Sequence, residues 1–141
     1  MNSRSLLAGA VAVAFMLPCL ASAEEVTPGG SGRGGSINST GSMWLGFAVS
    51  PNRRVFKSEA NAAEFAARNA AKSECEATTL RTCNVIAVPE AADVVAVGCT
   101  YNGRSNSFVG GSAQDAQLRI ALNKANDAGY PDSSCVEIYN Y

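Results

Sequence analysis

The side chains that could do chemistry in this chain are carboxylates, lysines and cysteines, because its 141 residues include no histidine. The lack of an imidazole excludes Ser/His/Asp and Cys/His catalysis, and it excludes zinc sites that use histidine. An enzyme built from this sequence would need paired carboxylates, or a serine next to a lysine.

The spacing of these residues indicates neither arrangement. Nothing in the sequence brings together the five carboxylates that a hydrolase could use, which are Glu59, Glu64, Asp93, Asp115 and Asp127. A Ser/Lys mechanism requires a lysine in an apolar pocket. We expect polar helix surfaces around the three candidate lysines, Lys57, Lys72 and Lys124. We therefore predict no catalytic residues and no cofactor.

Four of the five cysteines remain once Cys19 is assigned to an export signal, and they are Cys75, Cys83, Cys99 and Cys135. An even number of cysteines in an exported chain predicts two disulfides. Zinc sites made of four thiolates usually contain paired Cys-x-x-Cys motifs. This sequence has none, so we predict no metal site. All three possible pairings of the cysteines stay open at this point.

The first 23 residues have the three parts of a secretory signal peptide. Arg4 lies in the n-region, an apolar run extends from Leu6 to Leu17, and Ala21-Ser22-Ala23 forms a peptidase site before Glu24. The apolar run is shorter than the roughly 20 residues of a membrane helix. Cleavage after Ala23 therefore predicts a protein that is periplasmic or secreted.

The charge argues against a nucleic-acid partner. The net charge of −1 falls to −2 when Arg4 is removed with the signal, and the only adjacent basic cluster is Arg53, Arg54 and Lys57. Nucleic-acid binding needs a larger concentration of basic side chains. Arg53 and Arg54 stay candidates for contact with a protein partner, although a solvated turn is the simpler interpretation.

The chain ends in Ile138-Tyr139-Asn140-Tyr141. Aromatic side chains near a chain end are candidate contacts with a partner, and here they are Tyr139 and Tyr141. Packing of this tail on the protein's own sheet is the favoured alternative.

A Gly/Ser-rich stretch separates the signal from the folded part. Residues 28–42 contain six of the 13 glycines, and Gly and Ser bury little surface and lose much entropy on ordering. We predict a flexible linker over 24–42, no fixed structure before Met43, and a single domain over 43–141.

The folded part contains two similar halves, in which Asn52 and Arg54, for example, recur as Asn102 and Arg104. Each half begins with an apolar run that predicts a strand, over 44–50 and 94–101, followed by a turn and an Ala-rich helix. Each half closes with a short β-prone run after a cysteine, over 83–86 and 135–138.

The two helices follow from the spacing of small apolar residues. The first has alanines on one face, with Ser58 or Asn61 as N-cap: Ala63, Ala66, Ala67, Ala70 and Ala71. The second has a matching face, with Ser112 and Asp115 near its start and Gly129 before Pro131 at its end: Leu118, Ala121, Leu122 and Ala125. We predict an α+β fold in which both helices cover one face of an antiparallel sheet.

Several motifs resemble a bacterial exported domain of unknown function. The opening Trp44-Leu45-Gly46-Phe47-Ala48-Val49-Ser50 is similar to the family's Trp-Gly-Ala-Ile-Ala. Both of the family's helix-and-cysteine halves have counterparts here. Those of the first half are the spacing of Ala67, Ala71 and Cys75 and the motif Cys83-x-Val85. Those of the second half are Val97-Gly98-Cys99 and the helix before Cys135. The resemblance covers Met43 to Tyr141, but Ala125 stands where the family usually has a further cysteine.

The resemblance implies a disulfide pairing. If each half closes its own bridge, Cys75 pairs with Cys83, and Cys135, whose usual partner is replaced by Ala125, pairs with Cys99. The crossed alternative joins Cys83 to Cys99 and Cys75 to Cys135. The resemblance also implies an exported, non-catalytic domain, and it supplies no catalytic residues.

Together these features predict an exported, non-catalytic protein-binding module of the bacterial envelope, and within that class an immunity-type inhibitor of a periplasmic toxin. Proteins of that kind are small, exported and disulfide-bonded. The alternatives are a small envelope hydrolase that uses carboxylates and a secreted host-interacting factor. We expect the partner to be another protein, in the envelope or outside the cell, with no nucleic acid and no membrane span.

Overall fold

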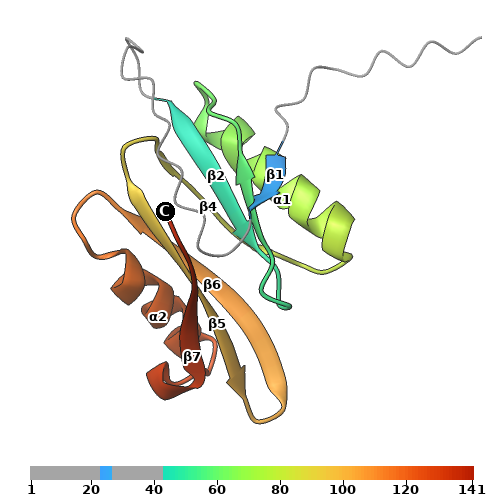
Figure 1. Ribbon diagram of the computed structural model, residues 1–141, viewed down its shortest axis with the longest axis vertical. Helices are drawn as coiled ribbons and strands as arrows, with labels where there is room; N and C mark the ends of the chain where they lie inside the picture. Colours follow the sequence, from blue (N-terminus) through green and yellow to red (C-terminus); the bar gives the residue numbers. More distant parts are fainter. Residues whose placement is uncertain (1–22, 27–42) are drawn as a thin grey trace, which may run out of the picture.

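The computed structural model describes residues 23–26 and 43–141, which form strands and helices in an α+β arrangement (Figure 1). In chain order the elements are β1 (Ala23–Val26), β2 (Trp44–Val49), β3 (Val55–Ser58), α1 (Glu64–Thr79), β4 (Asn84–Pro89), β5 (Asp93–Tyr101), β6 (Arg104–Ser112), α2 (Gln117–Asp127), a short 3-10 helix (Asp132–Ser134) and β7 (Cys135–Asn140). All strand pairs within the sheets are antiparallel. The predicted fold class is therefore confirmed.

The strands form two sheets, where the sequence predicts one. The first sheet has the order β1-β3-β2-β4 and the second has the order β6-β5-β7. The strands β2, β3 and β4 with helix α1 have the same order along the chain as β5, β6 and β7 with α2. In both sets the first strand lies between the other two.

Strands β3 and β6 have no predicted counterpart, because the sequence passes through polar residues after each turn. β6 begins Arg-Ser-Asn-Ser, a composition with low β propensity. It forms because the turn at Asn102 and Gly103, both with positive φ, folds it back onto β5, with which it pairs along its whole length.

Helix α1 lies against β2, β3 and β4 (Figure 1). The contact is made by a narrow stripe of small residues. Ala67, Ala71 and Cys75 are fully buried and lie one turn apart. The helix comes so close to β2 that a Cβ atom on Gly46 would lie 1.9 Å from the carbonyl oxygen of Ala67. The alanine face predicted for this helix does pack on the sheet, but fewer of its alanines are buried than predicted. Ala63, at the N-cap position, is exposed.

Helix α2 covers β5 and β6 in the same way. Ala121 and Ala125 are fully buried, and a Cβ atom on Gly110 would lie 2.2 Å from the Gln117 carbonyl oxygen. Gly129, with a φ of +93°, follows the helix end as predicted. Leu118 is 42% exposed, so the buried face of α2 is also narrower than predicted.

The predicted helix caps are wrong. Ala63 and Ala116 occupy the N-cap positions, and neither makes a side-chain cap hydrogen bond. The side chain of Asn61 instead accepts a hydrogen bond from the N–H of Ala63, and Ser112 accepts one from Gln114. Both polar side chains therefore stabilise the turn before the helix rather than its first turn.

The main core lies between the two sheets. In β2 the side chains of Leu45, Phe47 and Val49 face this core, and the intervening Ala48 packs in the cluster under α1. The inter-sheet core also includes Val55, Val88, Ala92, Val94, Ala96, Val109 and Tyr139. A separate cluster under α2 contains Val95, Val97, Cys99 and Phe108. Each sheet thus buries one face against its helix and the other against the second sheet.

Two disulfides join neighbouring elements. Cys75 of α1 is bonded to Cys83 before β4, and Cys99 of β5 is bonded to Cys135 of β7, with S–S distances of 2.00 and 1.98 Å. These are the pairs that the family resemblance implies, and the crossed alternative is wrong. Both bonds fit an exported protein.

Strand β1 corrects the prediction of no fixed structure before Met43. Ala23 to Val26 pair with β3, and Ala23 is buried. The outer edge of β3 offers unpaired backbone groups that these residues satisfy, and Glu25 adds an ion pair with Arg54. The rest of the predicted linker and the signal peptide lie outside the described residues. Among the described helices, none is long and apolar enough to cross a membrane.

Candidate functional site

The two sheets meet along the outer edges of β4 and β6, which we call the seam. Asn84 faces Ser107 at one end of the seam and Val88 faces Gly111 at the other, so the two strands run in the same direction. In the described part of the chain they are not paired as neighbours in a sheet. The seam is therefore a junction between two sheets whose contacts come from side chains.

Side chains satisfy the backbone carbonyl groups at this edge of β6. Asn84 Nδ2 donates to the Ser107 carbonyl oxygen at 2.5 Å, and Lys124 Nζ donates to the Val109 carbonyl oxygen at 2.8 Å. A carbonyl at an unpaired strand edge needs a partner when water is excluded. The amide of β4 thus links the two halves, whereas the ammonium of α2 makes its bond within the second half.

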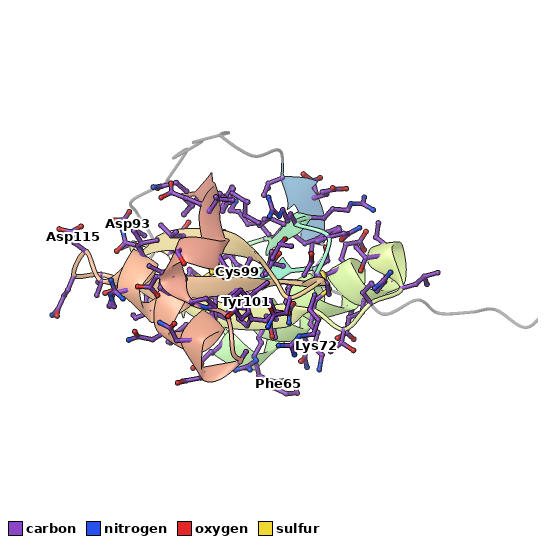
Figure 2. The ribbon with its side chains drawn as sticks, turned by 90° about the horizontal axis from the view of Figure 1, so that it is seen from below. Phe65, Lys72, Asp93, Cys99, Tyr101 and Asp115 are labelled. Atoms are coloured by element: carbon purple, nitrogen blue, oxygen red, sulfur yellow. A yellow bond between two sulfur atoms is a disulfide. The ribbon has the colours of Figure 1, made fainter. Side chains whose placement is uncertain are left out.

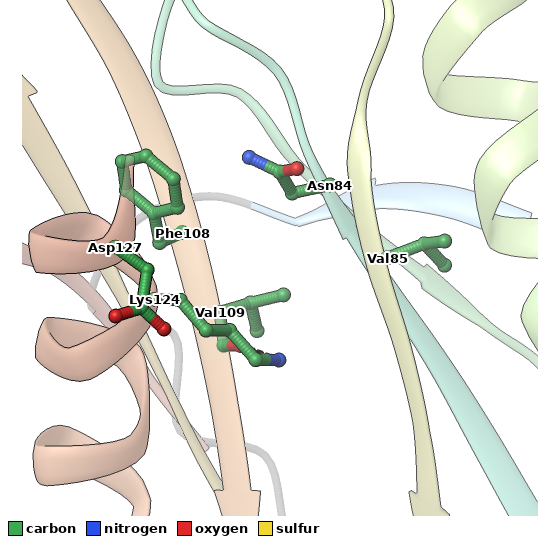
Figure 3. Close-up of a pocket in the computed structure, with 6 residues that line it drawn as sticks. All are labelled: Asn84, Val85, Phe108, Val109, Lys124 and Asp127. Carbon is green, nitrogen blue, oxygen red and sulfur yellow. Dashed lines mark hydrogen bonds between the residues drawn. The ribbon is translucent and has the colours of Figure 1, made fainter. Parts of the chain in front are cut away.

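A cavity of about 350 Å³ lies at the seam (Figure 3). It is lined by Asn84, Val85, Phe108, Val109, Lys124 and Asp127. Val85 packs against the cluster under α1, whereas Phe108 belongs to the cluster under α2. The cavity is therefore built by both halves, and an amide, an ammonium and a carboxylate are among the groups that line it.

Lys124 lies in surroundings that differ from the predicted polar helix surface. The residue as a whole is exposed, but its ammonium lies against the edge of β6. Burial of the ammonium and, secondly, repulsion from Arg68 of α1 lower the pKa of Lys124. The Ser107 hydroxyl, two positions before Val109 on β6, is buried and makes no hydrogen bond within the described residues. The hydrogen bond of the Lys124 ammonium goes to the Val109 carbonyl oxygen.

Asp127 is the last residue of α2 and carries the only carboxylate among the cavity-lining residues. It makes no hydrogen bond or ion pair within residues 23–26 and 43–141. A carboxylate at a helix C-terminus also faces the negative end of the helix dipole. Asp127 is exposed, so water rather than the fold solvates this charge.

The structure does not bring the other predicted carboxylates into the cavity. Glu59 follows β3, Glu64 begins α1, Asp93 begins β5 and Asp115 lies in the loop before α2. Figure 2 shows Asp93 and Asp115 toward one end of the molecule. In the described ranges, no three Cys, Asp or Glu residues come together in a group that could hold a metal ion.

The two arginines predicted to contact a partner contact other parts of the protein. Arg54 forms an ion pair with Glu25 of β1, with Nε donating to Oε1 at 2.8 Å. Their hydrogen bond raises the pKa of Arg54 and lowers that of Glu25. Arg53 lies over Gly98 of the other sheet and donates to the Thr100 hydroxyl at 3.4 Å. Both side chains therefore link elements, and Arg53 keeps substantial exposure.

The aromatic tail packs on the protein itself, as the favoured alternative predicts. Tyr139 is 2% exposed in the inter-sheet core, and its burial, with a smaller contribution from Tyr141, raises its pKa to about 12. The Tyr141 ring is half-buried, with its centroid 5.3 Å from that of Phe47. Lys57 Nζ lies 5.4 Å from the Tyr141 ring centroid. A partner has no access to the Tyr139 side chain in this fold.

Sequence reasoning missed Asn84, Val85, Phe108 and Val109 as cavity residues. Phe108 and Val109 lie on β6, a strand that the sequence pattern does not predict. Asn84 follows Cys83 directly, and a polar residue at the start of an apolar strand is the one signal that could have indicated it.

No family model, curated protein or solved structure matches this chain. The resemblance to the exported domain therefore stays a prediction.

Proposed function

We propose that this protein is an exported, non-catalytic protein-binding module of the bacterial envelope, in the periplasm or secreted, and that it acts as an immunity-type inhibitor of a periplasmic toxin. The observation that carries the proposal is the exposure of Phe65. This phenylalanine lies in the first turn of α1, and 75% of its surface is exposed (Figure 2).

Phe65 lies on the side of α1 that is turned away from the sheet. It precedes Ala67 by two positions, which places it roughly 200° around the helix from the buried stripe. Leu80, at the C-cap of the same helix, is 86% exposed. Exposed apolar side chains favour association, because a partner that covers them removes their surface from water. Aromatic side chains are also frequent among the residues that dominate protein interfaces.

The disulfides support the exported part of the proposal. Each one ties an element of the fold to the strand that closes the same half, β4 or β7. Such bonds persist in oxidising compartments and are rare in the cytosol. The signal-peptide pattern that ends at Ala23 points to the same location.

The first experiment is a pull-down from envelope extract and culture medium with the oxidised protein that begins at Glu24. We expect one stoichiometric partner that survives high salt, because apolar contacts are insensitive to ionic screening. The Phe65→Ala variant should no longer capture the partner. The Tyr101→Ala variant, which also loses a partly exposed aromatic ring, should capture it as the wild type does. Equal capture by both variants, or no partner, would overturn the role of Phe65.

The immunity role needs a second measurement. The purified product of a neighbouring gene should be bound tightly and its toxic activity should be inhibited by the wild-type protein. If that product is neither bound nor inhibited, the immunity role fails even when another partner is found. A partner from the host rather than the envelope would favour a secreted host-interacting factor.

The alternative of a carboxylate hydrolase has less support, because its mechanism needs two carboxylates and Asp127 is the only one among the residues that line the cavity. A wild-type protein without activity on cell-wall fragments would remove this alternative.

A further inference from the structure

Strand β1 lies at the outer edge of the first sheet, on the side opposite the seam (Figure 1). It pairs antiparallel with β3, with Ala23 opposite Ser58 and Val26 opposite Val55. Ala23 is 8% exposed and is the only buried residue of this strand. Ala23 therefore anchors the start of β1 on the sheet.

Cleavage of the signal peptide after Ala23 removes this anchor from the mature chain, a step that rests on the exported part of the proposed function. β1 then keeps Glu24, Glu25 and Val26, of which only Val26 is partly buried, against the inter-sheet core. The new α-ammonium group at Glu24 is charged, and a charge is costly to take out of water. A strand of three residues forms few ladder hydrogen bonds. The mature protein therefore covers the edge of β3 only weakly.

The ion pair between Glu25 and Arg54 does not replace the lost anchor. The Glu25 side chain is 42% exposed and that of Arg54 is 36% exposed. Ion pairs at the surface contribute little to stability. A strand edge whose backbone groups lack a firm partner is a template for pairing with another chain.

The side chains around β3 indicate what such a chain must carry. The Arg54 guanidinium, just before the strand, lies 5.7 Å from the Phe56 ring centroid, and Lys57 Nζ lies 5.4 Å from that of Tyr141. The β1 residues opposite Phe56 and Lys57 are both glutamates. Opposite charges on neighbouring strands attract each other. The edge therefore favours an acidic strand with an apolar residue opposite Val55.

We propose that in the mature protein an extended acidic segment of a partner protein takes the place of β1 on the outer edge of β3. This segment pairs antiparallel with β3 through backbone hydrogen bonds, as β1 does. A small residue lies opposite Ser58, in the position that Ala23 leaves. Two carboxylates follow at the positions of Glu24 and Glu25, and a β-branched residue at that of Val26. The segment thus pairs with all four residues of β3, whereas mature β1 keeps three of these pairs.

The test is an NMR titration of the oxidised protein that begins at Glu24 with an acetylated and amidated peptide, Ser-Ala-Glu-Glu-Val-Thr, which repeats residues 22–27. We expect saturable shifts of the backbone amides of β3 at millimolar concentration or below. A neutral peptide with glutamine in place of both glutamates should bind about fivefold more weakly, because it loses the charge contacts. A peptide with proline in place of the alanine and the valine should not bind, since proline cannot donate to a ladder.

Matched variants separate this edge from the rest of the surface. In Arg54→Gln the advantage of the acidic over the neutral peptide should shrink to about twofold, and this ratio is independent of how well β1 competes. In Arg104→Gln, which changes an exposed cation of the second sheet, the ratio should stay at about fivefold. A form that begins at Ala21 keeps Ala23 and should bind the acidic peptide about fivefold more weakly than the mature form, because its own β1 holds the edge.

Several outcomes would overturn the proposal. The absence of saturable shifts in β3 would exclude a strand site, and binding of the proline peptide would show a contact other than strand pairing. Equal binding of the acidic and neutral peptides would remove the charge recognition. Mass spectrometry of the exported protein identifies its first residue, and a chain that keeps Ala23 would overturn this inference together with the predicted cleavage. None of these results bears on capture of a partner through Phe65, so the two proposals fail separately.

Discussion

At the scale of single residues, Gly46 decides how close a helix can come to a sheet. A Cβ atom at this position would lie 1.9 Å from the Ala67 carbonyl oxygen, which belongs to helix backbone that cannot move aside alone. At Gly98 the nearest atoms belong instead to the exposed, flexible side chain of Arg53. The two glycines therefore allow a matched comparison.

We expect Gly46→Ala to destabilise the protein by about 3 kcal/mol, because it forces α1 away from β2. Gly98→Ala should cost less than about 1 kcal/mol, since Arg53 can turn away into solvent. Urea unfolding monitored by circular dichroism measures both changes. Equal losses would contradict the assignment of Gly46 as the contact that sets the helix position.

Burial of Tyr139 predicts a loss of stability at alkaline pH. Its pKa of about 12 in the folded protein exceeds the ordinary value of 10.0. The folded state therefore binds the proton more tightly, and the resulting stability is complete below pH 10 and is lost as the pH rises toward 12. The loss should reach up to about 3 kcal/mol, and Tyr139→Phe should make it smaller.

The measurement is the free energy of unfolding between pH 9 and 12 in the wild type, in Tyr139→Phe and in Tyr101→Phe. The exposed Tyr101 serves as the control and should leave the pH dependence unchanged. A Tyr139→Phe variant with the wild-type pH dependence would show that the hydroxyl of Tyr139 is not the group that titrates.

At the scale of elements, the two disulfides constrain the chain to different extents. Cys99 and Cys135 are 36 positions apart, whereas Cys75 and Cys83 are separated by 8. In the chain-entropy model a longer closed loop removes more freedom from the unfolded state. Replacement of Cys99 and Cys135 by alanine should cost about 4 kcal/mol, and replacement of Cys75 and Cys83 about 2.5 kcal/mol.

Thermal unfolding of the two double variants, each compared with the wild type, tests which disulfide contributes more to stability. A larger loss for the Cys75 and Cys83 variant would show that the anchoring of the α1 C-terminus to β4 matters more than loop entropy.

The elements also show where sequence patterns succeed. The apolar runs at 44–50, 83–86, 94–101 and 135–138 each coincide with a strand, apart from residues 50 and 83 at the ends of two runs, and both Ala-rich segments are helices. Strong hydrophobic periodicity, the turn signal at Asn102-Gly103 and the stop signal of Gly129 and Pro131 explain this success. Strands β1, β3 and β6 have short or polar sequences, and they form because a neighbouring strand offers them a pairing edge.

At the scale of the whole molecule, the inter-sheet core joins the two halves, and we expect them to unfold as one cooperative unit. Phe47 of β2 and Tyr139 of β7 pack in the same cluster, with ring centroids 6.1 Å apart. Trp44, the only tryptophan, reports on the first half. We expect urea unfolding curves from its fluorescence and from far-ultraviolet circular dichroism to coincide.

The seam contributes to this unit through Asn84. Asn84→Ala leaves the Ser107 carbonyl without its donor at the edge of β6 and should cost about 1 to 3 kcal/mol. Asn106→Ala is the control. Asn106 precedes Ser107 on β6, and its side chain only accepts a hydrogen bond from the Ser107 N–H, so this change should cost less stability. If Asn84→Ala separated the two unfolding curves, the side-chain contact, and not the core, would couple the halves.

The sequence by itself determined the export signal pattern, the exclusion of histidine chemistry, the α+β class and the identity of both helices, because these depend on composition and on local periodicity. Only the tertiary structure decided that the strands divide into two sheets, that Arg54 pairs with β1 and that Tyr139 is buried. The cavity at the seam belongs to the same group. Its lining comes from β4, β6 and α2, and residues from three separate elements meet only through long-range packing, which local patterns do not encode.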